Sequence, residues 1–156
     1  MKAYISVSTD NKNNSTSFIN QEVKFEDLPA ITNSQHYSAI SFKYGYRAGK
    51  NFQGVSLLIL DIDDGYSIAE VKEKLKGYQY LLCTTLHHQL SVKNGKSITP
   101  TDKYRLFFPL EKPITDPDEY QAVIKGLIKE FKADEKCSDL ARFFYCNPNQ
   151  EVHYGE

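Results

Sequence analysis

A run of apolar residues that ends in two acidic ones constrains this chain more than any other feature. The segment Val55 to Asp63 reads VSLLILDID, with apolar residues at both alternating positions of an extended strand. Such a strand is expected in the centre of a sheet that is covered on both faces. The two carboxylates that end it are two residues apart, so they should point to the same face at the rim of the sheet.

Two aligned carboxylates at the end of a buried strand indicate a site for divalent cations. Burying Asp61 and Asp63 without a counter-charge would be unfavourable. Mg²⁺ is held in proteins by one or two carboxylates together with substrate phosphates, and two ions about 4 Å apart stabilise both the attacking and the leaving oxygen of a phosphoryl transfer. The alternative is a charged strand end that leads into the polar turn Asp64-Gly65.

The order of elements around this strand predicts an α+β fold. The segments that follow it are a helix from Ser67, a strand over 78–86, a long hairpin loop over 89–102, a strand over 104–110, a helix from Asp116 and a strand over about 141–146. This is the βαββαβ order of ferredoxin-like and RRM-like sheets, with the helices expected on one face. A strand over 3–8, a polar loop and a strand over 37–47 form an N-terminal extension.

Length and composition are those of one globular domain. The chain has 156 residues, of which 40% are hydrophobic and 25% are charged. No apolar run reaches the roughly 18 to 20 residues that span a bilayer, and the N-terminus does not resemble a secretory signal. We therefore expect a cytoplasmic protein with no membrane partner. Its net charge of -1 means that a nucleic acid would have to be bound by a local basic cluster or through cations.

Two groups of basic residues are candidates for phosphate binding. Lys103 and Arg105 are two apart at the start of a predicted strand, so both could lean over one face and clamp phosphate oxygens. An edge strand that is protected by charge is the alternative. Lys43, Arg47 and Lys50, with tyrosines between them, suit a nucleic-acid backbone or an unstacked base.

Histidines and further acids lie near the predicted strand ends. His87 and His88 follow the strand over 78–86, and strand parity does not decide which of them faces the acidic pair; a contact with a triphosphate is the role we would assign. Asp134 and Asp139 both precede the last predicted strand, and either could complete a site with three carboxylates. Arg142, close to them in sequence, could bind substrate or orient an acid.

Four strings together resemble the archaeo-eukaryotic primase superfamily, above all the primase-polymerases of phages, plasmids and other mobile elements. They are LLILDIDDG, CTTLHHQ, DKYRLFFPLEKPI and ADEKCSDLARFFY, and they match in order and spacing. The resemblance spans about Tyr37 to Pro148 and implies that residues 1–156 form one primase-polymerase catalytic domain. The helicase and the C-terminal helical domain that are often fused to such enzymes have no counterpart in these residues.

The resemblance implies roles for individual residues. The metal ligands would be Asp61, Asp63 and, from a motif of a hydrophobic residue followed by Asp, Asp134, with Asp139 as the alternative. The incoming nucleotide would contact His88, because in TTLHHQ the second histidine precedes the glutamine; His87 takes the place of the small residue that the motif usually has. Arg105 and Arg142 match basic positions that recur in such proteins.

The implied chemistry is template-directed nucleotidyl transfer in DNA replication. A 3′-hydroxyl would attack the α-phosphorus of a deoxy- or ribonucleoside triphosphate with two Mg²⁺ or Mn²⁺ ions. The implied partners are a single-stranded DNA template, a primer, nucleoside triphosphates and a separate or fused helicase.

Two other functions are compatible with parts of the sequence. A primase fold without activity could serve as a binding module for nucleic acid or protein. LILDIDDG also resembles the first motif of haloacid-dehalogenase-type phosphatases, in which the first Asp is a nucleophile and the second a general acid. That motif usually lies near the N-terminus of a larger α/β sheet and has Gly after its second Asp, where this chain has Asp64.

Overall fold

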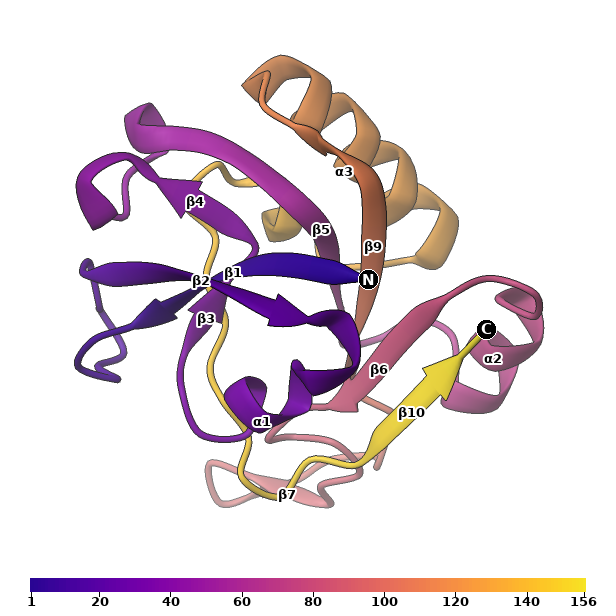
Figure 1. Ribbon diagram of the computed structural model, residues 1–156. Helices are drawn as coiled ribbons and strands as arrows, with labels where there is room; N and C mark the ends of the chain where they lie inside the picture. The colour runs from indigo at the N-terminus through magenta and orange to yellow at the C-terminus, as the bar shows by residue number, and fades with distance from the viewer.

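The computed structural model describes residues 1–156 as an α+β fold, as the sequence predicts (Figure 1). The strands are β1 (Lys2–Ser8), β2 (Phe18–Lys24), β3 (Tyr37–Ser38), β4 (Ile40–Phe42), β5 (Phe52–Ile62), β6 (Tyr80–Thr84), β7 (Val92–Lys93), β8 (Lys96–Ser97), β9 (Tyr104–Ile114) and β10 (Val152–Gly155). The helices are α1 (Pro29–Thr32), α2 (Ile68–Lys74) and α3 (Pro117–Phe131), with short 3-10 turns at Phe25–Asp27, Lys43–Gly45, Gly49–Asn51 and Glu135–Ser138. None of the helices is both long enough and apolar enough to cross a membrane.

The main sheet has five strands in the order β10-β6-β9-β5-β4. The long strand β5 lies between β4 and β9, and its residues from Leu57 to Ile62 are all buried. The prediction of a central strand covered on both faces is therefore confirmed. In the antiparallel pairing of β5 with β9, Asp61 lies directly opposite Arg105.

The two faces of the main sheet have different covers. Leu58 and Phe108, which pair across β5 and β9, face α2 and α3, where the ring of Phe108 lies 5.6 Å from that of Phe131. An ion pair of 2.6 Å between Lys74 and Glu130 joins the two helices. The helices therefore share one face, as the βαββαβ order predicts.

The opposite face carries Asp61 and Arg105, and the N-terminal extension covers part of it. Strands β2, β1 and β3 form a small antiparallel sheet, which lies in front of the main sheet in Figure 1. The backbone N–H of Tyr4 in β1 donates to Oγ of Ser56 in β5 at 2.7 Å. The ring of Tyr37 in β3 packs on Phe107 of β9, with 5.9 Å between the ring centroids. The N-terminal extension therefore covers part of the face that carries the acidic strand end.

The last predicted strand, about 141–146, is wrong, because the final strand is β10, which pairs with β6. Residues 141–147 cross the end of the sheet as an irregular segment, and Phe144 alone exchanges backbone hydrogen bonds with Tyr37. Side chains bond several of the other backbone groups: Ser38 donates to the carbonyl of Arg142 at 2.6 Å, and Nδ1 of His36 accepts from the N–H of Cys146 at 3.1 Å. A backbone that is bonded to side chains in this way cannot form a continuous ladder.

The turn after β5 packs closely against the end of α3, and Gly65 makes this possible. A Cβ at this position would lie 2.9 Å from the carbonyl oxygen of Lys132 and 3.1 Å from its Cβ. Lys132 ends α3 in a left-handed conformation, with φ at 55°. The chain that leaves α3 is thereby brought beside the end of β5.

We predict that Gly65→Ala lowers the free energy of unfolding by about 1 to 3 kcal/mol, because the new methyl group would overpack this contact. The matched control is Gly126→Ala inside α3, where a Cβ meets nothing within 4 Å. That change should raise the stability by roughly 0.5 to 1 kcal/mol. Urea unfolding of both variants is the measurement, and shifts of the same sign and size would contradict the assigned role of Gly65.

Candidate metal centre

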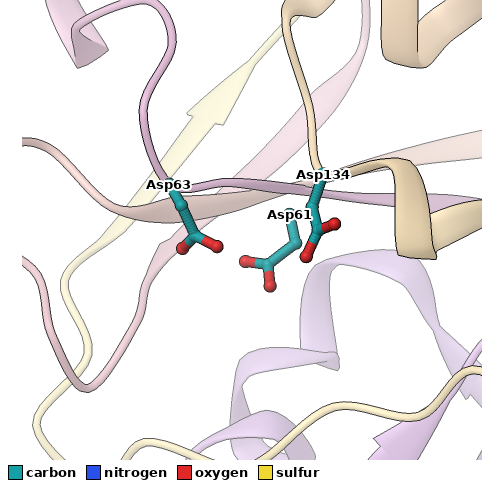
Figure 2. Close-up of side chains that lie close together, drawn as sticks. All are labelled: Asp61, Asp63 and Asp134. Carbon is teal, nitrogen blue, oxygen red and sulfur yellow. The ribbon is translucent and has the colours of Figure 1, made fainter.

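Three carboxylates converge at the end of β5. Asp61, Asp63 and Asp134 each offer one oxygen such that all three oxygens lie within 4.8 Å of one another. Figure 2 shows their side chains pointing to the same side of the strand. Asp61 is buried, with 6% of its surface exposed, so the group has one enclosed ligand at its centre. Oxygen ligands in this number and spacing suit a hard divalent cation such as Mg²⁺ or Mn²⁺.

Backbone hydrogen bonds hold Asp134 beside the strand. Its N–H donates to the carbonyl of Asp61 at 2.8 Å, and the N–H of Asp61 donates to Sγ of Cys137 at 3.3 Å. One oxygen of the Asp134 carboxylate accepts from the N–H of Lys136 at 3.0 Å, which begins the 3-10 turn Glu135–Ser138. The loop after α3 is thus attached to β5 on both sides of the acid.

Asp139 lies outside this group of three. Its carboxylate accepts a hydrogen bond from the N–H of Ala141 at 2.9 Å, at the end of the 3-10 turn. The sequence leaves Asp134 and Asp139 as alternatives for the third acid, and the structure brings Asp134 to the other two.

Two arginines flank the buried carboxylate of Asp61. Nε of Arg105 lies 3.4 Å from Oδ1, and Nη2 of Arg142 lies 3.3 Å from Oδ2. Burial raises the pKa of Asp61, and the charge of Arg105 acts in the opposite direction. Oδ1 is buried and accepts no hydrogen bond from the protein. A buried carboxylate oxygen without a donor fits a metal ligand, because a cation would satisfy it.

Arg105 is tightly held by groups other than Asp61. Its Nη1 donates to the carbonyl of Tyr145 at 2.6 Å and to the hydroxyl of Tyr37 at 3.0 Å. Its guanidinium also lies 4.9 Å from the centre of the Phe144 ring. These contacts make Arg105 part of the scaffold that positions Asp61, and its contact with a nucleotide stays a prediction.

A hollow of about 450 Å³ opens beside Asp61 and Asp63. Its basic wall contains Lys93 and Lys103, and Nζ of Lys103 donates to the carbonyl of Asp63 at 3.2 Å. Lys103 therefore lies beside Asp63, and its phosphate-binding role stays a prediction.

The two adjacent histidines occupy different places. The strand before them ends at Thr84 rather than at 86, so both lie in a turn and strand parity does not apply. His87 lines the hollow. Nδ1 of His88 accepts a hydrogen bond from the N–H of Lys103 at 3.0 Å, which ties the turn to the segment before β9. A contact between His88 and a nucleotide, which the resemblance implies, stays a prediction.

A third histidine, His36, lines the same hollow and was missed from the sequence. It is 8% exposed, and its ring lies 5.0 Å from the ring of Tyr145. Burial lowers the pKa of His36, and the charge of Arg105 acts in the same direction. It precedes β3 in a stretch without a motif, so no sequence signal pointed to it.

A second hollow of about 290 Å³ is also lined by Asp61 and contains Arg47 and Arg142. Arg47 donates to the carbonyls of Ser15 and Ala141 at 2.7 and 3.1 Å, and its guanidinium lies 4.4 Å from the ring of Phe143.

Lys43 and Lys50, the other members of that predicted patch, are exposed and do not line the second hollow. Nζ of Lys43 lies 5.2 Å from the ring of Tyr44, which is 89% exposed. Binding of nucleic acid by this patch stays a prediction.

Fold and site together define an α+β protein with antiparallel sheets, compatible with the primase fold, and with an acidic group that could bind a divalent metal. The structure is similar to the AEP domain of the primase-polymerase of cyanophage S-2L, with a TM-score of 0.50 over 99% of this chain and 81% of that chain. The two share 9% identical residues, so the similarity shows the fold. No protein-family model matches the sequence, and no curated protein matches it.

We predict that His36 makes stability depend on pH. The pKa of His36 is lower in the folded protein than in the unfolded chain. As the pH falls below about 6.5, His36 is therefore protonated in the unfolded chain before it is protonated in the folded protein, and stability is lost. His36→Gln should therefore show a shallower loss of stability between pH 7 and pH 5 than the wild type. Urea unfolding at several pH values measures this, and parallel curves for the two proteins would contradict it.

Proposed function

We propose that this protein is a primase-polymerase: a metal-dependent nucleotidyltransferase that extends a primer on a single-stranded DNA template during replication of a phage, plasmid or other mobile element. The observation that supports this most directly is the convergence of Asp61, Asp63 and Asp134 at the open end of the central strand. An acidic group of this kind, on a fold compatible with that of a primase-polymerase, suits two-metal phosphoryl transfer.

The residues fit Mg²⁺ or Mn²⁺ as cofactor. Asp61, Asp63 and Asp134 would hold the metal, and Oδ1 of Asp61 is buried beside Arg105 and accepts no hydrogen bond. When bound, two ions would lower the pKa of the primer hydroxyl and neutralise charge on the leaving pyrophosphate. The hydrogen bond from Asp134 to the backbone of Asp61 keeps the ligands in place before the substrates arrive.

Two hollows beside Asp61 suit a reaction of two substrates. Both hollows are lined by Asp61, Arg105 and Tyr145. We assign the hollow with Lys103 to the nucleoside triphosphate, because its lysines and histidines provide donors for phosphate oxygens. We assign the hollow with Arg47 to the nucleic acid, since it combines arginine with aromatic rings.

His88 and Arg142 are further proposed contacts of the triphosphate, with His87, which lines the nucleotide hollow, as the alternative to His88. Arg142 lines the second hollow and would reach a substrate phosphate from there. Lys43 and Lys50 would extend the nucleic-acid surface beyond the second hollow. We also propose that the protein acts in the cytoplasm and that a separate or fused helicase supplies the single-stranded template.

A second function is favoured by one specific observation. Asp61 already has two arginine counter-ions at 3.3 and 3.4 Å, which would also suit a purely structural charge cluster in an inactive binding module. Such a module would bind single-stranded DNA without regard to Mg²⁺. The phosphatase alternative requires a larger α/β sheet. The main sheet here has five strands that all pair antiparallel, so it does not match that requirement.

We predict that the protein extends a labelled primer on a single-stranded template with Mn²⁺ or Mg²⁺ and nucleoside triphosphates. Asp61→Asn with Asp63→Asn should reduce extension to background, because two of three metal ligands lose their charge. The matched control is Asp64→Asn, an exposed acid in the same string that lies outside the metal group; it should retain activity.

Two outcomes would count against the proposal. If the double variant extended primers as well as the wild type, the carboxylates of Asp61 and Asp63 would not be needed for activity. Absence of extension by the wild type, together with DNA binding that ignores both Mg²⁺ and the double substitution, would support the binding module.

A further inference from the structure

The two arginines beside Asp61 are held in different ways. Arg105 has hydrogen bonds to a tyrosine hydroxyl and a backbone carbonyl that do not involve the acidic group. The guanidinium of Arg142 has Asp61 and Asp134 as its polar partners, and its Nε is buried without a hydrogen bond. Its guanidinium also lies 5.1 Å from the centre of the Phe144 ring. Arg142 is therefore the arginine that can leave Asp61 without breaking other hydrogen bonds of its side chain.

The guanidinium of Arg142 lies beside the carboxylate oxygens that a metal ion would need as ligands. Its Nη2 is 3.3 Å from Oδ2 of Asp61 and 3.6 Å from Oδ2 of Asp134, so it bridges two of the three carboxylates. A divalent cation binds such oxygens at about 2.0 to 2.6 Å. A cation on these oxygens and the guanidinium would lie close together as like charges, so the two compete for the same ligands.

The local charge also limits metal binding. Three carboxylates and two guanidinium groups leave one net negative charge at the centre. One negative charge attracts a divalent cation less strongly than the three that the acids carry alone. The charge of a triphosphate would restore the attraction.

Resting on the proposed metal-dependent function, we propose that Arg142 is an internal counter-ion which occupies the metal site and is displaced when the divalent cation binds. Metal binding is then weak for the free protein and tight once a polyphosphate is present. The displaced side chain remains next to the second hollow, which it lines together with Arg47, and is there available to a phosphate of the nucleic acid. Arg142 thus couples metal loading to the arrival of substrates.

The test is direct binding of Mn²⁺, followed by the electron paramagnetic resonance signal of the free ion, without nucleotide or DNA. Arg142→Gln should bind Mn²⁺ at least about tenfold more tightly than the wild type, because a positive charge within about 4 Å of the ion is removed. Arg142→Lys keeps the charge and should stay closer to the wild type. The increase in Tm on adding Mn²⁺ should likewise be larger for Arg142→Gln, a readout that does not depend on activity.

Arg47→Gln is the matched control, since Arg47 lines the same hollow but bonds backbone carbonyls rather than the carboxylates. Its Mn²⁺ affinity should stay within about twofold of the wild type. Equal or weaker binding by Arg142→Gln overturns the inference, and so does an equal gain in the Arg47 and Arg142 variants, which would reflect overall charge. If Arg142→Gln does not fold, Arg142→Lys is the variant to measure. An Mn²⁺ affinity of Arg142→Lys that is about tenfold above that of the wild type also overturns the inference, because this variant keeps the positive charge.

Primer extension distinguishes a failure of the role of Arg142 from a failure of the proposed polymerase function. A wild type that extends primers with Mn²⁺, combined with an Arg142→Gln variant of unchanged Mn²⁺ affinity, overturns the role of Arg142 and leaves the proposed function in place. Absence of Mn²⁺ binding by every variant and by the wild type, with or without a nucleoside triphosphate, overturns the metal centre and this inference together.

Discussion

The ion pair between Asp61 and Arg105 lies at the place where the two long strands of the main sheet meet. Because β5 and β9 pair in register at these residues, a negative and a positive side chain emerge side by side from an otherwise apolar sheet. Neither charge would be stable there alone, since burial raises the pKa of Asp61. The hydrogen bonds of Arg105 to Tyr37 and Tyr145 then tie β3 and the C-terminal segment to the same point.

The rest of the centre is built outward from this pair. The close approach at Gly65 lets the chain after α3 run beside β5, where Asp134 bonds to the backbone of Asp61. The third carboxylate therefore comes from a loop whose position depends on how α3 packs on the sheet. Arg142 belongs to the irregular segment that follows, and its reach to two of the acids depends on the same arrangement.

An acidic group that carries its own counter-ions suits an enzyme that must assemble several components. A permanently open site with three carboxylates would bind cations whether or not substrates were present. Here the charges of Arg105 and Arg142 reduce that attraction, and the two hollows that Asp61 lines are the places proposed for a triphosphate and a nucleic acid. In the proposed function, the substrate phosphates contribute the negative charge that completes the metal site.

Local sequence by itself determined the central strand, both main helices and the acidic pair, because hydrophobic periodicity, capping residues and strand alternation act over a few neighbouring positions. The tertiary structure alone decided that Asp134 rather than Asp139 joins the pair, that His36 faces the hollow, and that 141–146 is not a strand. Each of these depends on contacts between segments far apart in the chain, and such contacts leave no periodic signal in the sequence.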